Sequence, residues 1–324
     1  MSTGTARVGF RVMRAGPLAL LQDAGRFGVR HLGVTQGGPA DLHAWAWANR
    51  LTGNDWGTPA VEITLGGLEL QAECELTIAV TGADLSAKQD GQPLPLWCSV
   101  RIRKGARLTF GIPIAGLRAY LAVSGGFVAE PVLGSAACVV REQLGGFNGR
   151  GQRLADRDQL TVLTSTDPAD GTPGAEAPEL ERPDYTAPAI LDLLPGAQLA
   201  DFTGRSLFDA FNAEWHVDDR ADRMGVRLRG PSLKCGIASM ISEGISLGAL
   251  QVPPDGQPIA LLNDRQTIGG YPRLGNLTPL AASRLAQCQP GQVVRLRPVG
   301  AENALGKHRH FINRVMARDQ RPLG

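Results

Sequence analysis

The segment of residues 261–275, LLNDRQTIGGYPRLG, gathers the side chains best suited to chemistry. Directly after an apolar run it offers a carboxylate, a guanidinium and an amide. A carboxylate can position a proton or hold a metal ion, and a guanidinium can stabilise negative charge on an oxygen atom. We therefore predict catalytic roles for four residues of this region: Asp264, Gln266, Glu243 and Arg265.

The residues that follow could hold a small ligand. Two consecutive glycines would let the backbone approach a planar or anionic group and present its N–H donors. A tyrosine could cover an apolar part of a substrate while its hydroxyl group forms a hydrogen bond. The predicted substrate-binding residues here are Thr267, Gly269, Gly270, Tyr271 and Gln251. The alternative is an ordinary turn with exposed polar side chains.

Three further candidates stand in the first half of the chain. Glu62 lies in the middle of the apolar run VEITL, where a carboxylate must face water, pair with a cation or line a cavity. Thr81 and Asp84 end a strand in the segment TGADLSA, beside a glycine that allows close approach of a ligand. We predict substrate binding for all three, and a polar turn is the alternative for Thr81 and Asp84.

Common catalytic motifs are missing from the sequence. Segment 300–308, GAENALGKH, has five residues between its glycines where a phosphate loop has four, and His308 stands where Ser or Thr should hold magnesium. Ser124 in AVSGG resembles a nucleophile elbow, but the segment after it is not helical in pattern. The 5 cysteines are scattered and form no Cys/His cluster, so we predict no metal site and reduced thiols.

The bulk composition limits the classes of function. The chain has 324 residues and a net charge of +2, which favours two domains and argues against binding to nucleic acid or to a membrane surface. No apolar run approaches the roughly 18–20 residues of a membrane span, and the N-terminus lacks the apolar core of a signal peptide. We therefore expect a cytoplasmic protein with no membrane partner and no nucleic-acid partner.

Short β-type runs separated by Gly, Asp or Pro must position these residues. They predict a mainly β fold, a barrel or sandwich, with few short helices. We expect an N-terminal domain at 1–165, a Pro- and Ala-rich linker at 166–188 and a C-terminal domain at 189–324. Helices are predicted at 41–52, capped by Asp41, at 205–214 and at the C-terminus; Asp90-Gly91 predicts a hairpin.

The order of the segments resembles a known family. Residues 8–298 contain LLQDAGRFGVRHLGVTQGGPAD, VEITLGG, TGADL, GLRAYLAVSGG, DRMGVRLRGP and SEGISLGALQVPPDGQPIALLNDRQTIGGYPRLG in turn. This series resembles the C-type subunit of the bacterial ATP-dependent 5-oxoprolinase, a family also labelled KipA, allophanate hydrolase subunit 2 or biotin-dependent carboxyltransferase. The resemblance implies two β-barrel domains, of which the second is cyclophilin-like. One departure is Ile268, where the family usually has a second Thr in QTTGGYP.

The resemblance also implies a reaction and partners. A KipI-like B-type subunit, together with a LamB/YcsF-like A-type one, would act with this chain on a small amide, 5-oxoproline, to give glutamate. ATP, shared with the KipI-like partner and accompanied or not by magnesium, would activate the lactam by removing its resonance. One alternative is the transfer of a carboxyl group from biotin to urea or a small amide. Another is a KipA-like regulatory antagonist of a KipI-like protein.

Overall fold

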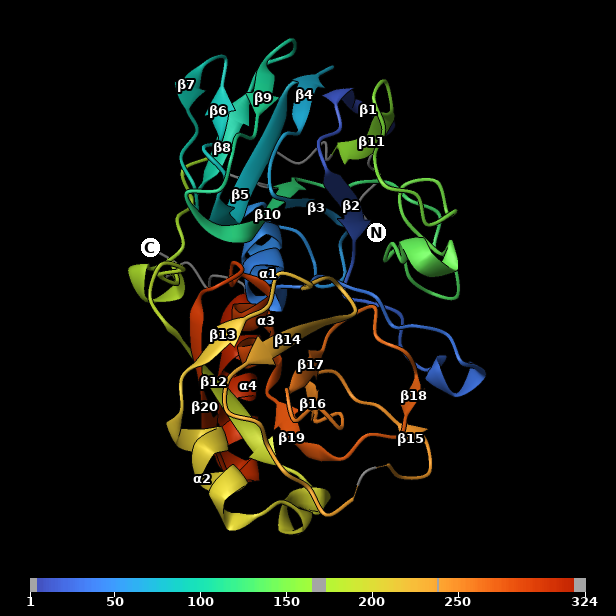
Figure 1. Cartoon of the computed structure of the whole chain (residues 1–324). Coiled ribbons are helices and arrows are strands. Elements are labelled where there is room, and N and C mark those ends of the chain that lie inside the picture. The colour runs from blue at the N-terminus through green and yellow to red at the C-terminus, as the bar shows by residue number, and fades with distance from the viewer. Residues whose placement is uncertain (1–4, 165–172, 238, 318–324) are drawn as a thin grey trace.

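The computed structural model describes residues 5–164, 173–237 and 239–317. The chain is arranged in two halves, one built from two sheets and the other around a closed barrel (Figure 1). The predicted mainly β fold with a few short helices is confirmed. Within the described ranges, every helix is too short or too polar to cross a bilayer.

The N-terminal half consists of two facing sheets. One contains, in spatial order, β11 (Gln159–Thr164), β1 (Thr5–Arg14), β4 (Glu69–Ala72), β9 (Arg107–Thr109), β6 (Lys88–Gln89) and β7 (Gln92–Pro93). The other contains β2 (Leu18–Gln22), β3 (Ala60–Thr64), β10 (Ala115–Val123), β5 (Leu76–Asp84) and β8 (Ser99–Ile102). Apolar side chains of both sheets share one core, including Phe10, Leu70, Ile78 and Leu121. Pairing keeps the two sheets separate, so this half is a sandwich rather than a closed ring.

The C-terminal half is a closed barrel of seven strands. Their order around the barrel is β12 (Ala189–Pro195), β19 (Arg273–Leu277), β16 (Ala249–Gln251), β17 (Ile259–Leu261), β14 (Gly225–Arg229), β13 (Trp215–Val217) and β20 (Val293–Pro298). Leu191, Leu228, Leu250 and Val294 pack in its core. A separate ribbon of β15 (Glu243–Gly244) and β18 (Ile268–Gly269) lies beside the barrel (Figure 1).

Helices fill the junction and the barrel surface. They are α1 (Leu42–Leu51), α2 (Gly204–Asn212), α3 (Pro279–Ala286) and α4 (Ala301–Met316). The Asp41 side chain accepts a hydrogen bond from Ala44 N at 3.0 Å, as the predicted N-cap requires. α1 packs on β5 and β10 of the first half and contacts α3 and α4 of the second (Figure 1). It is therefore the helix through which the halves meet.

The predicted linker, 166–188, falls partly outside the described residues, which omit 165–172. The remainder packs on the molecule. Glu176 forms a β-bridge with Cys98, a short 3-10 helix, η3, covers Glu179–Glu181, and the buried Tyr185 donates its hydroxyl hydrogen to Asp41 Oδ2 at 3.0 Å. The other 3-10 helices are η1 (Arg30–Leu32), η2 (Val140–Glu142) and η4 (Ala197–Asp201).

Candidate functional site

A buried group of charged side chains joins the two halves. Arg223, in the loop before β14, donates from Nε to Asp264 Oδ2 at 2.9 Å and from Nη2 to Asp264 Oδ1 at 3.0 Å. Its Nη1 donates to Glu62 of β3, and Nη2 also donates to Gly38 O at 2.7 Å. This fork is the strongest geometry that a guanidinium offers to a carboxylate. Arg223 therefore links two predicted site residues, Asp264 and Glu62, from opposite halves of the molecule.

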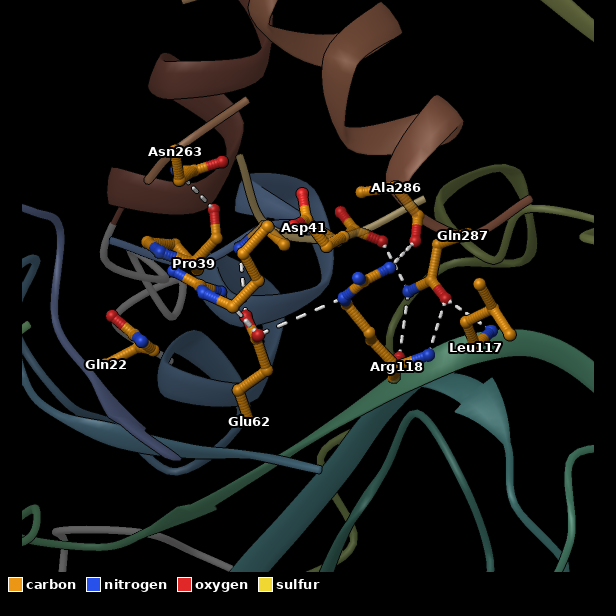
Figure 2. A network of polar contacts seen from close by, with 12 residues as sticks. Gln22, Pro39, Asp41, Glu62, Leu117, Arg118, Asn263, Ala286 and Gln287 are labelled. Carbon is orange, nitrogen blue, oxygen red and sulfur yellow. Dashed lines mark hydrogen bonds and ion pairs between the residues drawn. The ribbon is translucent and has the colours of Figure 1, made fainter. Parts of the chain in front are cut away.

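Glu62 is fully buried, and its environment stabilises the charged form. Oε2 accepts hydrogen bonds from Ala40 N at 2.9 Å and from the Tyr120 hydroxyl at 2.7 Å, and Oε1 lies 4.0 Å from Arg118 Nε (Figure 2). Burial acts to raise the pKa of Glu62, but Arg223, Arg118 and these donors outweigh it and hold that pKa below its ordinary value. Glu62 is thus a paired structural anion in this structure.

Asp264 differs from Glu62 in having one cation. Burial raises the pKa of Asp264 above its ordinary value, and the nearby charge of Glu62 acts in the same direction. The bidentate Arg223 opposes this shift but does not cancel it. The proton affinity of this carboxylate is therefore higher than that of an exposed aspartate.

Amide side chains extend the network across the junction. Gln287, just after α3, donates to Asp41 Oδ2 and to Arg118 O, each at 2.8 Å, and accepts from Leu117 N at 2.9 Å (Figure 2). On the other side Asn263 donates to Pro39 O at 3.0 Å (Figure 2). These bonds fix the loop before α1 against the barrel and so set the distance between the two halves. We call this set the junction network: Asp41, Glu62, Arg118, Tyr120, Arg223, Asn263, Asp264 and Gln287.

A pocket of about 570 Å³ opens beside this network. It is lined by residues of η1 in the N-terminal half and by residues of the ribbon of β15 and β18 and its flanks. Its lining residues are Arg30, His31, Gly33, Gly244, Ile245, Ser246, Thr267 and Ile268. We call it the ribbon pocket. Of the predicted site residues, it contains Thr267, together with the departure from the family pattern, Ile268.

One guanidinium group, that of Arg30, lines the ribbon pocket, and a second, that of Arg265, lies behind the lining residue Ile245. Arg265, only 2% exposed, donates to Leu262 O at 3.0 Å, to Ile245 O at 3.2 Å and to Gln36 Oε1 at 3.4 Å. Arg30 donates from Nη2 to Thr267 O at 3.2 Å and also to Ile245 O. Both side chains therefore use the same carbonyl oxygen. Burial, reinforced by the positive charge of Arg30, lowers the pKa of Arg265 to about 9, and burial also lowers the pKa of Arg30.

The two glycines of the IGGYP segment have a packing reason. A Cβ atom on Gly270 would lie 2.6 Å from Met240 O, and one on Gly269 would lie 2.4 Å from Ile245 Cδ1. Gly270 O also accepts from Met240 N at 2.9 Å. Close contact with the neighbouring segment therefore explains both glycines, while their predicted role in substrate binding stays a prediction.

The other predicted residues occupy several places. Glu243 is at the ribbon and forms an ion pair with Arg273, Gln251 is buried beneath Gly269, and Gln266 is half-buried between Arg265 and Thr267. Tyr271 is 44% exposed. Thr81 donates its hydroxyl hydrogen to Ala44 O of α1 at 2.6 Å, and Asp84 accepts from Ser86 N at 2.8 Å. Thr81 and Asp84 are thus engaged in local bonds of the N-terminal half.

Sequence reasoning missed the arginines. Arg223 and Arg30 both lie in segments that carried the family resemblance, but neither was a predicted site residue. A weak signal existed, since each arginine is followed within three residues by a glycine, Gly225 or Gly33. Their importance depends on contacts with residues far away in the chain, which periodicity does not reveal.

Comparison with known proteins places this architecture. The family described as carboxyltransferase domain, subdomain A and B, matches residues 32–298. The chain is 36% identical over 305 residues to the C-type subunit of 5-oxoprolinase from Escherichia coli strain K12, covering 91% of this chain and 93% of the relative. It is 33% identical over 290 residues to the corresponding 5-oxoprolinase protein of Haemophilus influenzae, covering 88% of this chain and 90% of the relative.

A solved structure is also similar along nearly the whole chain. The urea amidolyase of K. lactis matches with a TM-score of 0.88 and 26% identity over 96% of this chain. The matched part is only 20% of that much longer protein. One section of a larger enzyme therefore has a fold similar to that of this chain.

Proposed function

Because the chain belongs to the family of carboxyltransferase domains with subdomains A and B, we propose that it is the C-type subunit of an ATP-dependent 5-oxoprolinase. The observation that carries this proposal is the full-length similarity to a relative of that name: 36% identity with 93% of the E. coli protein covered. The chain would help to activate a cyclic amide and would act only with its partner proteins.

The chemistry at the ribbon pocket supports an amide as the substrate. A lactam resists hydrolysis because its nitrogen donates electrons into the carbonyl group, and phosphoryl transfer from ATP to the oxygen would remove that resonance. Negative charge develops on oxygen during both activation and ring opening. Arg30, in the pocket lining, and Arg265, behind Ile245, would stabilise such charge in a site of low dielectric.

The roles of the other predicted residues follow from their positions. Asp264, whose pKa burial raises, would accept a proton more readily than an exposed aspartate, and Arg223 fixes its orientation. Thr267, at the pocket wall, and Gln266 would contact the amide, and the half-exposed Tyr271 would cover it from the solvent side.

Partners would complete the site. We propose that a KipI-like B-type protein shares the bound ATP, with or without magnesium, and that a LamB/YcsF-like A-type protein completes ring opening in the cytoplasm. Leu32 and Ile268, next to or in the pocket lining, are 63% and 59% exposed. Apolar side chains exposed at a pocket are typical of a surface that a partner covers.

Reconstitution tests the proposal. The chain is mixed with homologous A-type and B-type proteins, ATP and 5-oxoproline, and glutamate and ADP are measured. We expect glutamate only when all three chains and ATP are present. Absence of glutamate under conditions in which a verified homologous set is active would contradict the proposal.

Carboxyl transfer is the second candidate. It is favoured by the TM-score of 0.88 to a urea amidolyase, whose matched section has the same architecture. In this case the chain would transfer a carboxyl group from biotin, carried by another module, to urea or a small amide. Avidin should then abolish product formation, whereas 5-oxoprolinase activity should be insensitive to avidin. Binding of a KipI-like homologue without turnover in either assay would instead support a KipA-like regulatory protein.

A further inference from the structure

The ribbon pocket contains an imbalance of charge. Arg265 is almost fully buried, and its three hydrogen bonds all go to neutral oxygens. Arg30 likewise donates only to the carbonyls of Ile245 and Thr267, and its buried Nη1 has no partner in the described part of the chain. Within those same residues, neither guanidinium forms an ion pair with a carboxylate.

Buried cations normally have a counter-ion. Charged groups removed from water are paired or coordinated in nearly all proteins because an isolated buried charge is strongly destabilised. Here the buried Arg265 and the half-buried Arg30 share the oxygen of Ile245, so they also repel each other. The nearest buried carboxylate along the chain, Asp264, is occupied by both bonds of Arg223. The charge of Asp264 also acts on Arg265, but Asp264 is bonded to Arg223, so a full counter-ion for the two arginines is missing among the residues described.

The shape of the site shows where that counter-ion would lie. The pocket of about 570 Å³ falls within the range of roughly 300–1,000 Å³ typical of small-molecule sites. His31 adds a potential cation, and no carboxylate is among the lining residues that the structure describes. Glu243, at the ribbon, is paired with Arg273. An anion entering this space would meet positive groups and no negative one.

We propose that the ribbon pocket is an oxyanion-binding site in which Arg30 contacts a carboxylate or phosphate group and the buried Arg265 supplies the positive charge behind it. A guanidinium presents parallel N–H donors that match two oxygens of either group. Arg30 lines the pocket, and its buried Nη1, which has no hydrogen-bond partner among the described residues, lacks an acceptor. Arg265, which is held by three bonds to the surrounding chain, is a positioning and electrostatic residue.

This inference deepens the proposed function, on which it rests only for the identity of the anion. With 5-oxoproline as substrate, the anion would be its carboxylate, which is absent from urea. With ATP in the pocket, it would be a phosphate group. The anion site itself can be tested without catalysis.

The experiment measures direct binding by titration calorimetry, with the full chain alone and with its partner proteins. The probes are inorganic phosphate, ATP, 5-oxoproline and 2-pyrrolidinone, a neutral lactam of the same ring size. Sodium chloride keeps the ionic strength equal in all samples, because screening alone changes the affinity of exposed cations. We expect phosphate or 5-oxoproline to bind and 2-pyrrolidinone to bind far more weakly.

Variants assign the binding to the pocket. Arg30→Gln should weaken anion binding about 10- to 100-fold, which is the usual effect of losing hydrogen bonds to a charged group. Arg30→Lys should retain part of the affinity because it keeps the charge and loses the fork. The matched control is Arg101→Gln, which removes an exposed arginine of β8 paired with Glu75 and should bind like the wild type.

A second measurement separates binding from folding. In buffer without added phosphate, ATP or 5-oxoproline, Arg30→Gln should unfold at the same temperature as the wild type or higher, because it removes one of two neighbouring positive charges. Phosphate or 5-oxoproline should raise the melting temperature of the wild type and not that of the variant. A large loss of melting temperature in Arg30→Gln would mean that the guanidinium is a structural bridge, and would overturn the proposal.

The outcomes identify the anion and distinguish the two hypotheses. Binding of phosphate and ATP alone supports a phosphate site, and binding of 5-oxoproline alone supports a carboxylate site. No binding of any anion, alone or in the complex, or unchanged binding by Arg30→Gln, overturns the proposal. Anion binding without glutamate production would keep the site and reject the 5-oxoprolinase function. Glutamate production unaffected by Arg30→Gln would keep the 5-oxoprolinase function and reject the anion site.

Discussion

The junction network contains a buried arginine together with its carboxylates, whereas Arg265, the buried arginine behind the ribbon pocket, forms no ion pair in the described part of the chain. Arg223 is held by Asp264 and Glu62, whereas Arg265 has three neutral oxygens around it. Arg223 has its pKa raised by those anions despite burial, and Arg265 has its pKa lowered by burial. A buried charge with its partners inside the chain holds the fold together, whereas one without them is set up to receive a partner from outside.

The largest effect is expected from Arg223→Met, which leaves two buried carboxylates facing each other. Removing one partner from a buried ion pair costs about 3–5 kcal/mol. Urea denaturation followed by fluorescence measures the loss. Arg220→Met, three residues earlier in the same loop, removes an arginine whose side chain is 68% exposed and should change stability far less. Equal losses in both variants would erase the distinction between the two regions.

Glu62→Gln should have the second-largest effect, a loss of about 2–3 kcal/mol in the free energy of unfolding. The substitution removes the charge from the bonds to Arg223 and Tyr120 but keeps the shape of the side chain. The pKa of Glu62 in the folded state lies below its ordinary value of 4.5. The stabilisation that the charged Glu62 gives to the folded state is therefore complete above pH 4.5. It is lost as the pH falls through the pKa of Glu62 in the folded state. Denaturation curves at several pH values should show the gap between wild type and variant narrowing below pH 4.5. A constant gap would count against a charged Glu62.

Gly270→Ala probes the packing of the segment that follows β18 of the ribbon. The new Cβ atom would lie 2.6 Å from the backbone oxygen of Met240, so the neighbouring segments must move apart. We expect this to lower the free energy of unfolding by about 1–3 kcal/mol. Gly244→Ala in the partner strand meets nothing within 4 Å and is the matched control. Thermal unfolding of both variants measures the difference. If Gly270→Ala were as stable as Gly244→Ala, the packing explanation for the second glycine would be wrong.

Arg265→Met makes the sharpest comparison with Arg223→Met, since both remove an arginine that is nearly inaccessible to solvent. We expect Arg265→Met to lower the free energy of unfolding by only about 1–2 kcal/mol. The neutral acceptors lose their hydrogen bonds, but no ion-paired carboxylate loses its partner. The same denaturation assay provides the number. A loss as large as that of Arg223→Met would show that Arg265 has an anionic partner within the chain.

Thr81→Val should have the smallest effect, about 1 kcal/mol, from the lost hydrogen bond to Ala44 O. Calorimetric titration with 5-oxoproline should give the affinity of the wild type. Weaker binding in this variant would support the predicted role of Thr81 in substrate binding.

Local chemistry explains which parts of the fold were predictable. Asp41 caps α1 as expected, and Asp90-Gly91 joins β6 to β7 with φ values of 50° and 82°. α3 was not predicted, although Thr278 and Pro279 provide a helix start signal of a known kind. Each of these features depends on a few neighbouring residues, so the sequence contains the information directly.

The site was predictable only in part, because its contacts are long-range. The sequence singled out Glu62 as a carboxylate that needs a cation or a cavity, and that cation is Arg223, 161 residues away. It also indicated the segment after residue 261, part of which lines the ribbon pocket. Arg30, which donates to Thr267 O, belongs to the other half and is 237 residues away in the chain. No rule of sequence spacing predicts that these two residues meet.

Strand pairing has a consequence for how the chain is made. In the first half β1 pairs with β11, and in the barrel β12 pairs with β20. In both halves the first strand can therefore pair fully only after the last strand has been synthesised. Such distant pairing slows folding, because loop-closure entropy is lost before the contacts form. We expect the sandwich to be complete on the ribosome while the barrel is still open, with the half-made barrel exposed to chaperones and proteases.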